Sequence, residues 1–152
     1  MRVTLKAIAD YLQAQLDATR GTGLRITVHR HSARGVAAPY VILTADPHPY
    51  RSRPLGGAAG DEVSGDIVTI NVHATEDGAT WVADRVRSVL SPNLRPVRIP
   101  HDDRAIEVSW DAGFGTSLAT DRDVTLPGTN SHPGVAHEGY LISAHAIAPD
   151  ES

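Results

Sequence analysis

The chain has 152 residues, no cysteine, and a formal charge of -4 at pH 7 from 14 basic and 18 acidic residues. This length suits one domain with a hydrophobic core, so we expect a single domain over residues 1–152. The lack of cysteine excludes a disulfide framework, a thiolate metal site and a cysteine nucleophile. The negative net charge is not typical of a nucleic-acid-binding protein, and we expect no direct sequence-specific contact with nucleic acid.

No stretch of the sequence has the length and apolarity of a membrane span. About 18 consecutive apolar residues are needed to cross a bilayer, and no such run occurs. Residues 1–6 begin an amphipathic pattern instead of the apolar run of a signal peptide. These features predict a soluble protein that is made in the cytoplasm and does not contact a membrane.

The N-terminal third predicts one helix and two strands. Apolar residues recur at helical spacing over residues 4–18, and the Gly-containing segment 20–23 then breaks the pattern. Alternation over residues 24–31 predicts a strand with a polar outer face. The nearly continuous apolar run 39–45 predicts a more central strand.

Residues 46–64 are rich in proline, glycine and charge and show no periodicity, which predicts a long loop. Unstructured loops of this length inside compact domains are usually functional or disordered. We therefore expect this loop to contact a partner and to become ordered on assembly, because it has too little apolar content to pack by itself.

An alternating strand over residues 66–73 leads into an amphipathic helix that begins after 75–77 and ends at Leu90. The helix buries one apolar stripe, and Trp81 falls roughly opposite the centre of that stripe, on the same face as Arg85. Two explanations remain open. Another part of the chain, such as the C-terminal tail, covers the indole, or the indole contacts a second subunit.

The C-terminal half predicts a hairpin and one further strand. Residues 97–99 and 106–110 alternate around a turn at 100–103, residues 111–133 look irregular, and residues 140–147 form the last strand. The elements together predict an α+β fold: a mostly antiparallel central β-sheet with about two α-helices packed on one face and long loops.

Candidate chemistry is sparse. His29 and His31 share a strand face and could chelate a metal, but no third ligand is evident. His137-Glu138 lacks the second histidine of a zinc-hydrolase helix. The Asp pairs at 102–103 and 121–123 lie in predicted turns, where Asp commonly caps backbone amides. We expect no catalytic residue, no metal ligand and no cofactor; the alternative is a small bacterial enzyme or ligand-binding domain with a His/Asp site.

The order of elements, and above all the helix Thr-Trp-Val-Ala-Asp-Arg-Val-Arg-Ser-Val-Leu at residues 80–90 after an alternating strand, resembles tail terminator proteins of long-tailed phages, particularly those of actinobacterial hosts. The resemblance covers most of the chain, except at 126–134, where such proteins often carry a Pro-Pro-aromatic step. It implies an α+β subunit without enzyme activity, in a hexameric ring. The ring caps the tail tube, stops its polymerisation and presents a surface to the head-completion protein, at the head-tail junction of the virion.

In such a ring the subunits would meet head to tail, with one surface of each subunit against a different surface of the next. Positive charge concentrates in residues 85–104 and negative charge in residues 61–77. These charges would steer neighbouring subunits into register, or both groups are simply solvated. The residues that we expect at the interface are charged or aromatic, namely Arg51, Arg53, Asp61, Glu62, Trp81, Arg85, Arg95 and Arg98.

Overall fold

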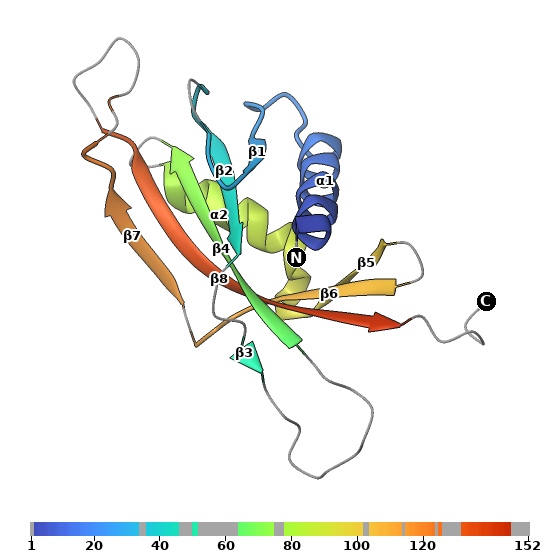
Figure 1. Cartoon of the computed structure of the whole chain (residues 1–152). Coiled ribbons are helices and arrows are strands. Elements are labelled where there is room, and N and C mark those ends of the chain that lie inside the picture. Colours follow the sequence, from blue (N-terminus) through green and yellow to red (C-terminus); the bar gives the residue numbers. More distant parts are fainter. Residues whose placement is uncertain are drawn as a thin grey trace.

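A computed structural model of the chain describes residues 2–33, 36–45, 50–51, 64–74, 78–101, 104–113, 115–123, 125 and 132–146. Within these ranges lie two α-helices, one 3-10 turn and eight strands (Figure 1). Their bounds are α1 Arg2–Ala18, β1 Thr27–Arg30, β2 Tyr40–Ala45, β3 Tyr50–Arg51, β4 Ser64–Ala74, α2 Gly78–Leu90, η1 Pro92–Leu94, β5 Val97–His101, β6 Arg104–Trp110, β7 Thr116–Thr120 and β8 Gly134–Ala146.

The strands form one sheet in the order β1-β2-β4-β8-β6-β5, with β3 added to β4 and β7 added to β8. The strand pairs are antiparallel except for β1 and β2, which run parallel. The long strand β8 pairs with β4 along one edge, while β7 and β6 follow each other along its other edge. This is the mostly antiparallel sheet that the sequence predicted.

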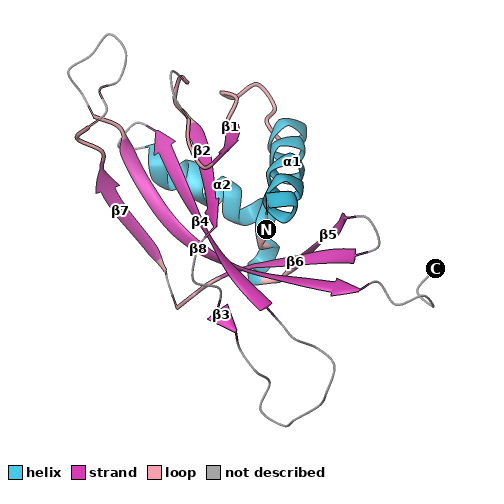
Figure 2. Cartoon of the chain, in the orientation of Figure 1, coloured by secondary structure: helices cyan, strands magenta, loops and turns pink. Residues whose placement is uncertain are grey.

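Both helices pack on the same face of the sheet, as expected (Figure 2). Each helix turns one apolar stripe toward the strands, because its apolar residues recur every three or four positions. Leu12 of α1 and Val86 of α2 are fully buried there, together with Val41 of β2. The helices and the sheet therefore share a single core, and this confirms the α+β fold class.

Three predicted strand bounds were wrong, and two short strands were not predicted. The first strand begins at Thr27 instead of residue 24, and Leu24, which fitted the alternation, is 73% exposed in the segment before the strand. β3 and the first residue of β4 lie inside the segment predicted as the loop 46–64. β7 lies in the segment predicted as irregular, and β8 begins at Gly134 instead of residue 140.

The missed strand β7 has a physical explanation. Its five residues are all exposed, so it has no buried face and shows no apolar alternation. It continues the line of β6 along β8, because Trp110 pairs with Tyr140 and Thr116 pairs with Glu138. Between the two strands, the Gly115 amide donates to the Asp111 carbonyl at 3.2 Å, and Gly115 has a positive φ of 68°.

Candidate functional site

Trp81 lies on the outward side of α2, as the helical spacing predicted. Its neighbours Val82 and Ala83 are buried in the core, whereas Trp81 is 49% exposed. The C-terminal tail that could have covered the indole lies outside the described residues. Trp81 is thus a large aromatic side chain that the core does not use and that is accessible on the subunit surface.

Arg85, on the neighbouring turn of α2, connects the two helices. Its guanidinium donates to the carbonyl and to the hydroxyl of Thr19, at 2.9 and 2.8 Å, just beyond the C-terminus of α1. A cation there also suits the negative end of the helix dipole. Arg85 is half-buried, and its hydrogen bonds to Thr19 link α2 to the end of α1.

The other predicted interface residues are more dispersed. Arg95 and Arg98 are exposed on the segment that follows α2, and Arg98 pairs with Glu107 at 3.4 Å. Arg51 belongs to β3, which pairs with the start of β4 beyond the end of β2. The remaining three predicted interface residues, Arg53, Asp61 and Glu62, lie outside the described residues.

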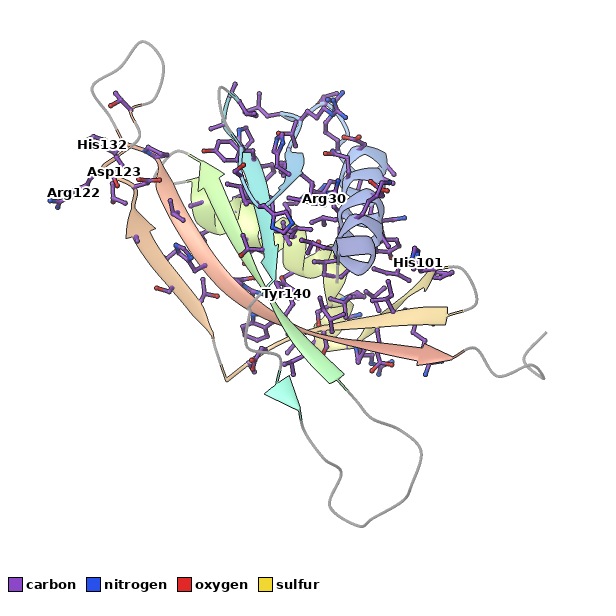
Figure 3. All side chains as sticks on the ribbon, viewed as in Figure 1. Arg30, His101, Arg122, Asp123, His132 and Tyr140 are labelled. Carbon is purple, nitrogen blue, oxygen red and sulfur yellow. The ribbon has the colours of Figure 1, made fainter. Side chains whose placement is uncertain are left out.

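A buried polar cluster that the sequence did not reveal lies between α2 and the sheet. At its centre is Glu138 of β8, which is only 1% exposed. Arg87 of α2 forms an ion pair with its carboxylate, Thr116 of β7 donates to it at 2.8 Å, and the hydroxyl of Tyr140 donates to it at 3.1 Å. Figure 3 labels Tyr140 on β8 in the middle of the sheet. The cluster thus connects α2, β7 and β8 through one carboxylate.

The surroundings of the cluster keep Arg87 charged and the Tyr140 hydroxyl protonated. The hydrogen bond to Glu138 raises the pKa of Arg87, so the guanidinium stays charged. Burial, with a further contribution from the Glu138 carboxylate, raises the pKa of Tyr140 far above its usual value, so its hydroxyl remains a donor. The guanidinium of Arg87 also lies 4.7 Å from the centre of the Trp110 ring, a cation-π contact.

This cluster corrects one part of the charge prediction. Arg87 was counted with the surface charges of residues 85–104, but its guanidinium turns toward the sheet and neutralises Glu138. Helical spacing alone gave a hint, because Arg87 lies at the border of the apolar stripe of α2. No local signal identified its partner, since Glu138 is 51 residues away in the sequence.

The histidines of the alternative prediction, His29 and His31, lie in β1 and directly after it. His29 Nε2 is 2.9 Å from the hydroxyl of Thr27, and its ring meets Tyr40 edge-on. His31 has a positive φ of 67°, so it leaves the strand alternation. Both border an open hollow lined by residues 28–32. No group of three or more potential metal-ligating side chains occurs in the described ranges.

Two Asp side chains, one of them in a predicted Asp turn, cap local backbone amides. The Asp121 carboxylate accepts a hydrogen bond from the amide of Asp123 at 3.1 Å, and Asp111 does the same for Gly113 at 2.9 Å. This confirms the turn interpretation for Asp121. Figure 3 shows Arg122, Asp123 and His132 together near the connection between β7 and β8. The pair at 102–103 lies outside the described residues.

Neither of the helices in the described part of the chain is long and apolar enough to cross a membrane.

Comparison with known proteins finds no matching family model and no matching curated sequence. Among solved structures, the chain is similar to one whose name states no function, with 17% sequence identity and a TM-score of 0.51; it is one of 4 matching chains. That similarity covers 98% of this chain and 97% of the other. At such low identity it shows a shared α+β fold over the whole length and nothing about activity.

Proposed function

We propose that this protein is a tail terminator of a long-tailed phage, a structural subunit without enzyme activity. It assembles into a ring, hexameric by the family resemblance, that caps the tail tube, stops tube polymerisation and offers a surface to the head-completion protein. It belongs to the virion, at the head-tail junction. The resemblance of the helix at residues 80–90, the order of the elements and the α+β layer of two helices on one sheet face support this proposal.

The observation that carries the proposal furthest is Trp81. A half-exposed indole beside a helix-bridging arginine is the composition typical of an interface centre, where Trp and Arg anchor subunits. Arg95 and Arg98 are exposed on the segment that follows α2. In a head-to-tail ring, this surface of one subunit meets a different surface of its neighbour.

The test separates assembly from folding. Replacing Trp81 with Ala removes an anchor typically worth about 2 kcal/mol or more, roughly a 30-fold weakening of each contact in the ring. Its melting temperature should change little, because half of the side chain is already exposed. Leu24→Ala, at another exposed apolar side chain, is the matched control and should assemble normally. A large fall in the melting temperature of the Trp81 variant, with assembly tracking only the folded fraction, contradicts the interface role.

The functional experiment uses infected cells. Deleting the gene should yield tails of irregular, excessive length that do not join heads, and supplying the wild-type protein should restore them. Supplying the Trp81→Ala variant should restore them poorly. Tails of normal length attached to full heads after deletion would overturn the terminator assignment.

A further inference from the structure

β7 is an edge strand with an open side. It pairs with β8 alone, and Figure 1 shows it at the border of the sheet. The amide of Asp121, just after β7, donates to the carbonyl of Pro133 at 3.0 Å, which marks residues 121 and 133 as a hydrogen-bonded pair. Such pairs recur at every second residue of an antiparallel ladder. The backbone N–H and C=O groups of Thr116, Leu118 and Thr120 therefore point away from β8.

These outward groups have no partner in the described part of the chain. No described backbone or side-chain group hydrogen-bonds the main chain of Leu118 or Thr120. All five residues of β7 are exposed, and the Leu118 side chain is 62% exposed. The edge thus combines free main-chain donors and acceptors with an exposed apolar side chain.

The edge strands β1, β5 and β3 carry protection that β7 lacks. On β1, the side-chain amide of Gln13 donates to the carbonyl of Ile26 at 3.0 Å and accepts from the amide of Val28 at 2.8 Å. This side chain occupies the outer edge as a neighbouring strand would. β5 contains Pro100 and the exposed Arg98, and β3 has only two residues. Proline, charge, short length and covering groups are the usual ways to block edge pairing.

β7 has the sequence Thr-Ser-Leu-Ala-Thr, with neither charge nor proline. It reads almost the same in both directions around Leu118. If two copies run antiparallel with Leu118 opposite Leu118, each Thr116 faces a Thr120, and each Ser117 faces an Ala119. The outward N–H and C=O groups of the two copies then meet, because both strands present them at residues 116, 118 and 120.

We propose that two copies of this chain pair edge to edge through β7 around a two-fold axis at Leu118, so that the sheet continues from one subunit into the other. The interface is short and lies far below the roughly 1,200 Å² of a stable complex, so the dimer is weak, with a Kd on the order of 100 μM to 1 mM. This pairing uses a surface different from that of Trp81 and does not rest on the terminator proposal. Free subunits can therefore form a dimer through β7 without forming a ring.

The decisive experiment exploits the position of residue 118 opposite itself. In sedimentation equilibrium, Leu118→Lys and Leu118→Glu should each dimerise at least roughly tenfold more weakly than wild type, because like charges then face each other across the axis. An equimolar mixture of the two variants should recover dimers. Leu24→Lys, at an exposed position between α1 and β1, is the control and should behave as wild type.

Amide hydrogen exchange provides an internal control within β7. As the concentration of wild-type protein rises, the amides of Leu118 and Thr120 should become protected. The amides of Ser117 and Ala119 already point toward β8, so their exchange should not change.

A wild-type chain that remains monomeric at about 2 mM overturns the proposal. The proposal is also overturned if Leu118→Lys dimerises as strongly as wild type. It is equally overturned if the mixed Lys and Glu variants do not recover dimers, because residue 118 then does not face itself. Because the ring is tested through Trp81, each of these results leaves the terminator proposal untouched.

Discussion

Removing the guanidinium of Arg87 tests whether the buried cluster fixes α2 and β7 to the sheet. In Arg87→Ala, the carboxylate of Glu138, which is only 1% exposed in the wild-type protein, loses its counter-charge. Thr116 and Tyr140 still donate to it, at 2.8 and 3.1 Å. The variant also loses the cation-π contact with Trp110. The carboxylate is therefore left partly solvated by hydrogen bonds and without charge compensation.

The magnitude follows from this geometry. Breaking a buried ion pair by removing one partner costs about 3–5 kcal/mol. The Arg87 side chain is 26% exposed and two donors to Glu138 remain, so we expect the low end, about 3 kcal/mol. For a chain of this length, 1 kcal/mol corresponds to roughly 2–4 °C, so the melting temperature should fall by roughly 6–12 °C. Arg98→Ala, which removes a surface pair with Glu107, should cost less than about 1 kcal/mol.

Urea unfolding of Arg87→Ala, Glu138→Gln and the double variant measures the coupling directly. Because the neutral amide no longer needs a counter-charge, the double variant should lose less free energy of unfolding than the sum of the single losses, by about 1.5 kcal/mol or more. Strictly additive losses would show that the two side chains do not act as a pair. A loss for Arg87→Ala no greater than that for Arg98→Ala would refute the reasoning about burial.

Three further variants test local features. Gln13→Ala should lower the free energy of unfolding by about 2 kcal/mol and speed exchange of the Val28 amide, because the Ile26 carbonyl and the Val28 amide both lose their partner. An unchanged exchange rate would contradict the edge-blocking role. The hydrogen bond from Arg25 lowers the pKa of Asp17 below 3.8. The difference in unfolding free energy between wild type and Asp17→Asn should therefore be present above about pH 5, and it should disappear as the pH falls through the lowered pKa. Thermal melts across this range check the sign, and a difference that grows on acidification would refute it. Gly115→Ala should lower the free energy of unfolding by about 1–2 kcal/mol, because φ is 68° there and a Cβ is disfavoured in this region. An unchanged free energy of unfolding in chemical denaturation would contradict this.

The sequence was informative wherever an element has one apolar side. Both helices were predicted close to their bounds because their buried residues recur every three or four positions. β2 and the β5–β6 hairpin were predicted because their apolar residues alternate or cluster between turn residues. The outward position of Trp81 also followed from spacing alone. In each case, the signal lies within about a dozen neighbouring residues.

Pairing between distant segments was decided only by the tertiary structure. β7 has no buried side, so only its register on β8 makes it a strand. β8 was recognised from residue 140 onward because the charged Glu138 interrupts its apolar pattern, and that charge is tolerated in the core only because Arg87 and Thr116 converge on it. A single sequence carries local periodicity, but a buried carboxylate and its counter-charge on different elements become neighbours only when the helix packs on the sheet.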